Sequence, residues 1–440
     1  MRTILFYIVF LSAFAAKAQF SIATYQSKER LPESNWLNPA FMPDNKLVIG
    51  LPGLSSVAFD AGMGFSFNDI FVRDMNDSLV IDKENFPLGL KKRMDNSLDL
   101  DIQLLMVGIR MGQGYISFGS RLRSESRVNY TSELIKWALL GPGDNRVSNT
   151  IDLNDFQAFS ATYLEYSATY ARQITDKLTV GVRVKHLNGL AGGEGSQDGS
   201  LHISADSVTL ILNNSEYNMS GFNAIGNYSP SEFLSGPNNG YGIDVGIDFE
   251  LSESMSFSGS LTDIGFINWK TDIQSYRSEN INYKFKGVDV VQLMFDPNSA
   301  NPSNELDSLV TLIKPQEQTI TSFRTGLNGK ATAGVHYDLN LLGSIGGTVY
   351  SGLNGGKLDP VIGVNYQLKL KSILTVLAGI TYKDKSIENV MAGLIVKPGP
   401  VQVYVLTDRL NSYFVPANAN SLNLRFGMNI AIGKAGVNIE

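Results

Sequence analysis

Strands in which apolar side chains alternate with polar or small ones recur along this chain, and this pattern restricts the fold more than any other feature. Residues 420–433 read NSLNLRFGMNIAIG, and the segments 177–187, 241–251 and 361–371 repeat the alternation. Successive side chains of a strand point to opposite faces, so each segment has one apolar and one polar face. The segments run for about ten residues, longer than the usual strand of five or six. That length suits a tilted membrane crossing of 9–11 residues.

The first 18 residues have the order of an export signal. Arg2 precedes an apolar stretch from Ile4 to Ala16, and Ala16-Lys17-Ala18 fits the small-residue cleavage pattern. We expect a signal peptide over residues 1–18, cleaved before Gln19. The rest of the chain has no apolar run near the 20 residues that a membrane-spanning helix needs. A chain of this kind that crosses a membrane must do so as a closed barrel.

The connections between the alternating segments support the barrel. Short turns such as 112–113, 252–254 and 397–400 alternate with longer, more polar segments. Outer-membrane barrels have this arrangement because their periplasmic turns are tight and their outer loops long. We therefore predict an all-β fold, a transmembrane antiparallel β-barrel of about 14 strands over residues 47–440, located in the outer membrane. The two longest segments, 189–239 and 265–329, are expected to be extracellular loops. A soluble propeller or sandwich would have shorter strands without this alternation of connection lengths.

Composition and charge exclude several functions. Without residues 1–18 the chain keeps 34 basic and 42 acidic residues, so a broad basic surface for nucleic acid is not expected. There is no cysteine, which excludes disulfides, catalytic thiols and thiolate metal sites. The three histidines, His186, His202 and His336, are scattered without the spacing of a metal site. We predict that the protein is not an enzyme and needs no cofactor.

Several charged residues fall on the polar faces of the predicted strands and are therefore expected to point into the lumen. Both signs are present, whereas a charge-selective pore needs rings of one sign. We expect these charges to pair with one another or with a segment in the lumen. The residues are Arg121, Arg123, Arg183, Lys185, Asp244, Asp248, Glu250, Lys369 and Arg425.

The segment 19–46 is too polar and too often interrupted by proline to be a barrel strand. It contains Trp36-Leu37-Asn38-Pro39-Ala40-Phe41. An Asn-Pro-Ala segment ahead of about 14 strands resembles the FadL-type transporters of hydrophobic compounds, in which that segment belongs to a plug in the lumen. The resemblance implies that Trp36, Asn38, Pro39, Ala40 and Phe41 belong to a plug here. The alternative is a simple turn, in which Pro39 restricts Asn38 to extended conformations.

Two further stretches, EYSATYARQITDKLTVGVRVKHLNG (165–189) and LTDIGFINW (261–269), resemble an uncharacterised Bacteroidota group within the same barrel superfamily. A type IX secretion shuttle barrel belongs to that superfamily too. The resemblance implies two alternative functions. The first is binding or passage of a hydrophobic small molecule, and the second is a docking or shuttle role for secreted or cell-surface proteins. In both, outer-membrane lipid surrounds the barrel and no nucleic acid takes part.

Overall fold

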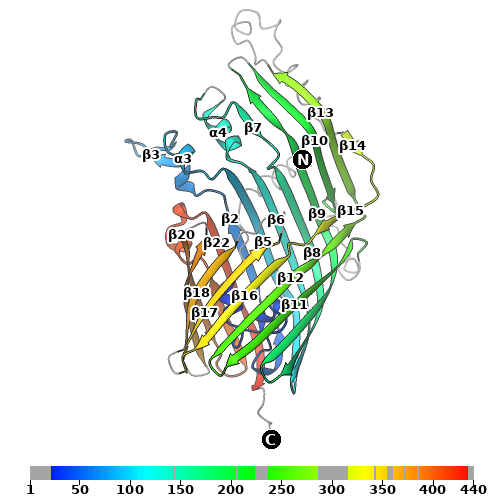
Figure 1. Ribbon diagram of the computed structural model, residues 1–440, viewed down its shortest axis with the longest axis vertical. Helices are drawn as coiled ribbons and strands as arrows, with labels where there is room; N and C mark the ends of the chain where they lie inside the picture. Colours follow the sequence, from blue (N-terminus) through cyan, green and yellow to red (C-terminus); the bar gives the residue numbers. More distant parts are fainter. Residues whose placement is uncertain are drawn as a thin grey trace, which may run out of the picture.

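The computed structural model of the chain shows a closed antiparallel barrel (Figure 1). It describes residues 21–141, 144–204, 207–222, 236–285, 316–340, 343–353, 360–370, 373–383 and 386–434. The expected signal peptide, residues 1–18, lies outside these ranges. The described strands form a 14-stranded barrel, which confirms the predicted fold class. The barrel closes where the last strand, β22 (Ser421–Lys434), pairs antiparallel with both parts of the first, β1 (Asn45–Gly50) and β2 (Val57–Gly62).

Each remaining barrel strand pairs with the next one along the wall, with no crossover. In order these are β5 (Arg93–Met111), β6 (Gly114–Thr131), β8 (Gln157–Thr175), β9 (Leu178–Ile203), β11 (Asn239–Ser252), β12 (Met255–Trp269), β16 (Lys330–Asp338), β17 (Ser344–Gly352), β18 (Val361–Leu370), β19 (Leu374–Lys383), β20 (Ser386–Val396) and β21 (Val401–Thr407).

Short elements connect these strands or lie in the lumen. The helices are α2 (Ile22–Gln26), η1 (Pro32–Trp36), η2 (Phe67–Asp69), α3 (Phe86–Gly89), α4 (Ser132–Leu140), α8 (Asn411–Phe414) and η5 (Pro416–Asn418). The shorter or peripheral strands are β3 (Phe71–Arg73), β4 (Leu79–Ile81), β7 (Thr150–Asp152), β10 (Val208–Ser220), β13 (Ile273–Phe285), β14 (Gln316–Gln318) and β15 (Phe323–Gly326). No helix in the described ranges is long and apolar enough to span a membrane.

The outer surface of the barrel is apolar. On β18, Ile362, Val364 and Tyr366 are 46%, 49% and 39% exposed, while Asn365 and Gln367 between and beside them are buried. The same alternation runs along β11, where Val245 and Ile247 face outward. Large apolar side chains exposed all around a closed barrel match a lipid environment, with the polar residues turned inward. The fold is that of a transmembrane β-barrel.

A charge on this apolar surface should be costly. Val245 lies in the middle of β11, 39% exposed, opposite the outward-facing Val182. We expect Val245→Arg to destabilise the barrel by roughly 2–4 kcal/mol, because it places a charge near the bilayer midplane. Urea unfolding in lipid vesicles measures this loss, with Val245→Leu as the matched apolar control. Equal stability of the two variants would contradict the outward facing of Val245.

The first long segment, 189–239, is not a loop over most of its length. Residues 189–203 continue β9, which is 26 residues long, and residues 208–220 form β10. The barrel half of β9 pairs with β11, and its outer half pairs with β10. The glycines that made 192–199 look like a loop leave room for large rings, since the indole of Trp269 occupies the space beside Gly192. Residues 223–235 lie outside the described ranges.

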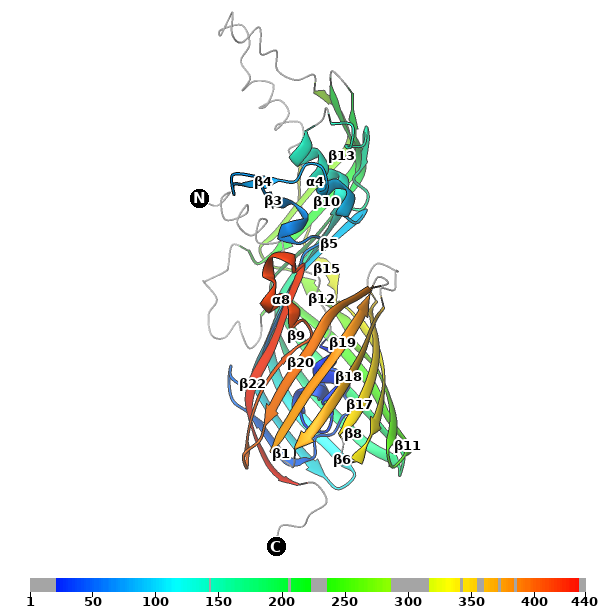
Figure 2. The same cartoon turned by 90° about the vertical axis from the view of Figure 1, so that its left-hand side faces the viewer.

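The second long segment, 265–329, is likewise partly strand. Residues 265–269 end β12, and β13 pairs along its length with β10. Because β10 pairs with the outer half of β9 and β13 pairs with β10, the sheet continues beyond the barrel on one side (Figures 1 and 2). Residues 286–315 lie outside the described ranges. The parts of the two predicted loops that extend this sheet are therefore strands, and the extracellular placement of both segments stays a prediction.

The first barrel strand is interrupted by the turn 51–56. Six residues stand there opposite only Gly427 and Met428 of β22. Hydrogen bonds still bridge the turn, because Met428 N donates to the Leu54 carbonyl at 2.8 Å and Gly53 N to the Gln103 carbonyl at 3.1 Å. Leu54 points outward and is 59% exposed, whereas Ser55 is buried. The wall is continuous at this turn, but fewer backbone bonds hold it.

The topology predicts which connections are reachable from outside the cell. The turn between β3 and β4 belongs to a long connection, and the turn 398–399 between β20 and β21 is tight. We expect an epitope inserted at Asn76-Asp77 to be labelled on intact cells, and one at Pro398-Gly399 only after permeabilisation, because outer loops are long and periplasmic turns short. Both sites are exposed in the folded protein, so only sidedness distinguishes them. Labelling of Pro398-Gly399 on intact cells would invert the topology.

Candidate functional site in the barrel lumen

Residues 21–44, here called the lumen segment, lie inside the barrel (Figures 1 and 2). Because β1 begins at Asn45, the segment ends at Asp44, two residues before its predicted end at Lys46. Trp36, Asn38, Ala40 and Phe41 are 6% exposed or less, and Pro39 is buried with them. All five candidate plug residues therefore lie in the interior between segment and wall.

One side of the lumen segment packs on an apolar part of the wall. Ile22, Ala23, Tyr25, Leu31 and Phe41 form a buried cluster with inward-facing residues of β17–β21, namely Tyr350, Val361, Leu377, Met391, Ile395, Tyr404 and Leu406. The start of α2 is fixed by Asp408, whose Oδ1 accepts a 2.9 Å hydrogen bond from Ala23 N. The segment thus covers this apolar cluster of the wall.

The other side of the segment rests on Arg183 of β9, which is fully buried. Its guanidinium donates to the Asn35 carbonyl at 2.7 Å, to Asn35 Oδ1 at 2.6 Å and to the Trp36 carbonyl at 3.1 Å. The indole of Trp36 also lies 4.7 Å from the Arg183 guanidinium and 4.1 Å from that of Arg121. Two arginines of the wall therefore hold one tryptophan of the segment by cation–π contact and charge-assisted hydrogen bonds.

The Asn38-Pro39 corner fits against two glycines of the wall. Asn38 Nδ2 donates to the backbone carbonyls of Ile247 and Gly259, at 3.1 and 3.2 Å. A Cβ at Gly246 would collide with the Asn38 side chain, and one at Gly181 with the backbone of Pro39. The wall thus approaches this corner more closely than any residue with a side chain would allow.

A continuous ion-pair network lines the charged side of the lumen. Arg121 bonds Asp101 at 2.8 Å and Glu165 at 2.7 Å, and Arg123 bonds Glu165 and Asp263. Lys185 lies 2.6 Å from Asp263 and 2.8 Å from Asp244, and Arg183 lies 3.1 Å from Asp244. The four predicted basic residues of β6 and β9 thus have acidic partners. Buried pairs of this kind resist the loss of either partner, because the remaining charge would stay unpaired in a low-dielectric site.

The remaining predicted charges take no part in the ion pairs named above. Asp248 accepts a 2.8 Å bond from Lys28 of the lumen segment, and Lys369 donates to Glu29 at 2.8 Å. Arg425 is half-buried and donates to Ser56 Oγ at 2.9 Å. Glu250 differs, since its side chain is exposed at the end of β11 rather than enclosed in the lumen. It lies two residues before the β11–β12 turn, where the wall no longer surrounds it.

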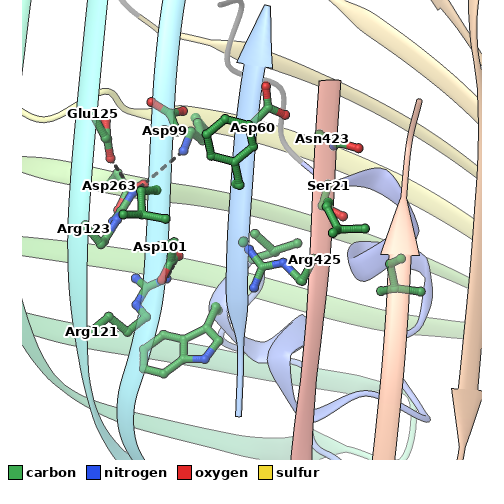
Figure 3. Close-up of a pocket in the computed structure, with 18 of the residues that line it drawn as sticks. Ser21, Asp60, Asp99, Asp101, Arg121, Arg123, Glu125, Asp263, Asn423 and Arg425 are labelled. Atoms are coloured by element: carbon green, nitrogen blue, oxygen red, sulfur yellow. Dashed lines mark hydrogen bonds and ion pairs between the residues drawn. The ribbon is translucent and has the colours of Figure 1, made fainter. Parts of the chain in front are cut away.

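A small cavity of about 90 Å³ lies between the segment and the wall (Figure 3). Trp36 and Leu37 line it from the segment, and charged residues of β2, β5, β6, β12 and β22 line it from the wall. Those labelled in Figure 3 are Asp60, Asp99, Asp101, Arg121, Arg123, Glu125, Asp263 and Arg425. A polar cavity of this size has room for a few water molecules. With the segment in place, it is too small for a drug-sized ligand.

Comparison with known proteins gives the family. The model of a family of unknown function (DUF5723) matches residues 39–408. The chain belongs to the DUF5723 family. The match starts at the Asn38-Pro39 corner and runs through the barrel to Asp408, the residue that holds α2. No curated protein is similar in sequence to this DUF5723 chain.

Several solved outer-membrane barrels are similar to the DUF5723 chain at low identity. A FadL homologue of Pseudomonas aeruginosa is 9% identical with a TM-score of 0.44, covering 94% of this chain and 98% of that one. The toluene transporter TbuX of Ralstonia pickettii is 10% identical with a TM-score of 0.42, covering 92% and 95%. The toluene transporter TodX of Pseudomonas putida is 9% identical with a TM-score of 0.41, covering 95% and 97%.

Of the acidic partners in the network, Asp101, Glu165 and above all Asp263 were missed by sequence reasoning, whereas Asp244 was predicted. Strict alternation along β12 puts Leu261 and Asp263 on the same, outward face. In the DUF5723 barrel the pairing of β11 with β12 shifts between Ile243 and Val245, and Asp263 has a positive φ of 59°. This bulge turns Asp263 inward beside Thr262. A lone aspartate in an otherwise apolar half-strand is the only signal that could have indicated it.

The part of the DUF5723 chain that the structure describes contains no candidate metal site. No group of three or more His, Cys, Asp and Glu side chains there could hold an ion. The acidic residues of the lumen instead face arginines and lysines.

Proposed function

We propose that this outer-membrane barrel binds or passes a hydrophobic small molecule, and that the lumen segment is a displaceable plug. The observation that carries the proposal is the division of the inner wall. On its β17–β21 side the segment covers a buried apolar cluster, with polar residues such as Gln367 and Gln402 beside it, while the β6–β9 side is charged and anchors the segment. Displacing the segment would expose this apolar cluster to the lumen. A hydrophobic solute would bind there more favourably than water does.

The interrupted first strand supports the same proposal. Tyr404, a member of the apolar wall, donates its hydroxyl to the Ser55 carbonyl at 2.8 Å within the turn 51–56. The apolar cluster therefore runs up to the part of the wall where the turn 51–56 interrupts the first strand. A solute that leaves the lumen sideways would pass there, since the regular ladder of hydrogen bonds is interrupted at this turn.

The proposal is tested by deleting Glu33 to Asp44. We expect the barrel still to assemble, because the ladder from β1 to β22 and its lipid-facing surface do not depend on these residues, and Arg121 and Arg183 keep acidic partners. The opened lumen should then leak small polar solutes that the intact protein excludes, since wide barrels leave aqueous channels. Liposome swelling measures the leak, and heat-modifiable gel mobility confirms a folded barrel.

Transport itself needs a second measurement. Cells with the intact protein should take up a hydrophobic fluorescent tracer, such as N-phenylnaphthylamine, faster than cells without it. A leak on deletion without any uptake difference would keep the plug and remove the transport proposal. A docking or shuttle role for secreted or surface proteins, the alternative suggested by the resemblance to secretion barrels, would then be preferred. The absence of a leak from a folded deletion variant would remove the plug as well.

A further inference from the structure

Two loops at the outer end of the barrel expose a compact group of apolar side chains. Phe67 belongs to η2 in the loop after β2, and Tyr413, Phe414 and Val415 belong to α8 and its end in the loop before β22. Their exposed fractions are 46%, 42%, 75% and 49%. We call these four residues the rim patch. Clustered exposed apolar groups of this kind usually mark a surface that contacts something other than water.

The two loops are joined and therefore present the patch as one surface. Asn68 next to Phe67 donates a side-chain hydrogen bond to Asn418 in η5. The Phe67 ring also stacks on Phe71, with centroids 4.8 Å apart. Tyr413 is fixed by a 2.8 Å hydrogen bond from its hydroxyl to the Asn423 carbonyl of β22. Its ring can thus stay exposed while its polar end is satisfied within the protein.

The position of the patch indicates what covers it. β2 ends at Gly62, directly opposite Ser421 at the start of β22. Phe67 lies five positions after Gly62, and Val415 lies six positions before Ser421. Just inside the strand ends, Phe59 and Phe426 face outward, 37% and 45% exposed. Figure 2 shows α8 at the edge of the barrel end, beside β22. The rim patch therefore continues the lipid-facing surface of this side of the barrel.

We propose that the rim patch inserts into the outer leaflet of the membrane, at the boundary between head groups and acyl chains. Aromatic side chains with one apolar and one polar end favour this depth, and short helices with an apolar face lie in the same plane. Phe414 and Val415, at the tip, enter deepest. Tyr413, whose hydroxyl is bonded to the barrel, lies at the level of the head groups.

The absence of cysteine from the whole sequence makes the experiment direct. Single-cysteine variants Phe414→Cys and Val415→Cys are nitroxide-labelled in the full-length protein, in vesicles of phosphatidylethanolamine and phosphatidylglycerol. Collision with oxygen, which enters lipid, is compared with collision with a water-soluble nickel chelate. Ile362→Cys on the lipid-facing surface and Asn213→Cys on the exposed part of β10 are the references.

We expect both patch labels to collide more with oxygen and less with the nickel chelate than the Asn213 label does, with a depth between the two references. Patch labels that behave like the Asn213 label would overturn the proposal. Dipolar broadening that disappears on dilution of the protein in lipid would also overturn it, because it would assign the patch to contact with a second copy. Both cysteines replace exposed side chains, and heat-modifiable mobility confirms folding before labelling.

Discussion

Replacing Arg183 by methionine is expected to destabilise the protein by about 3–5 kcal/mol, which is the usual cost of removing one partner of a buried ion pair. The side chain is fully buried and, besides its three bonds to Asn35 and Trp36, it contacts Asp244 at 3.1 Å and Thr169 at 2.9 Å. Methionine fills part of the volume but donates no hydrogen bond. The lumen segment would lose its main anchor on the charged side, and Asp244 would lose one of its two basic partners.

The matched control is Arg425→Met on β22. Arg425 also faces the lumen, but it is only half-buried. Its guanidinium donates a 2.9 Å hydrogen bond to Ser56 Oγ. Its loss should cost about 1 kcal/mol, the net worth of an ordinary hydrogen bond. Urea unfolding in lipid vesicles gives both values. Equal losses of unfolding free energy in the two variants would mean that the contact between Arg183 and the lumen segment stabilises the protein no more than an ordinary hydrogen bond does.

Adding a single methyl group at Gly181 or Gly246 is expected to displace the Asn38-Pro39 corner from the wall. The new Cβ would overlap the backbone of Pro39 in the first case and the Asn38 side chain in the second. Overpacking of this kind costs ~1–3 kcal/mol. The same free energy corresponds to about a 5–150-fold rise in the population of the displaced state. Because displacement opens the lumen, small-solute leak should rise in proportion. The effect should be larger at Gly181, where rigid backbone is the obstacle.

Gly259→Ala on β12 is the control for these two variants. Its added Cβ would stand 3.6 Å from the nearest atom, a side-chain carbon of Ile247, which is ordinary van der Waals contact. All three substitutions add the same group to a barrel strand, so differences in strand propensity cancel. Liposome swelling with small sugars gives the leak. A leak from Gly259→Ala as large as that from Gly181→Ala would show that the strand, and not the corner, is responsible.

The membrane-facing surface could be predicted from sequence because it follows one simple periodicity. Residues such as Val245 and Ile362 alternate with small or polar neighbours. A shift of the strand register by one residue would turn the polar side chains toward lipid, so lipid on one side fixes the register. The basic residues Arg183 and Lys185 were placed in the lumen by the same alternation, and the structure puts both in its interior. For regular strands, two-residue periodicity therefore located both faces of the wall.

The features that sequence did not reveal are those that break the periodicity or depend on distant partners. Asp263 turns inward only because of a bulge, and no pattern along β12 predicts where an extra residue is inserted. The glycine-rich outer half of β9 looked like a loop because glycine has a low strand propensity, but the ring of Trp269, far along the chain, fills the space. The hydrogen bonds between Arg183 and Asn35 join residues 148 positions apart, so only the folded wall brings them together.

The lumen segment is also a constraint on assembly. It lies ahead of all the barrel strands in the chain, yet its Glu33 accepts a 2.8 Å hydrogen bond from Asn429 of the last strand, and its Trp36 donates to Gln103 of β5. In a chain exported from its N-terminus, these residues reach the periplasm first and must wait there for the final strand before their contacts can form. Loop closure across almost the whole chain carries a large entropic cost, which only the closed wall offsets. The earliest part of the protein to emerge is thus among the last to become ordered, and the seam between β1 and β22 closes around it.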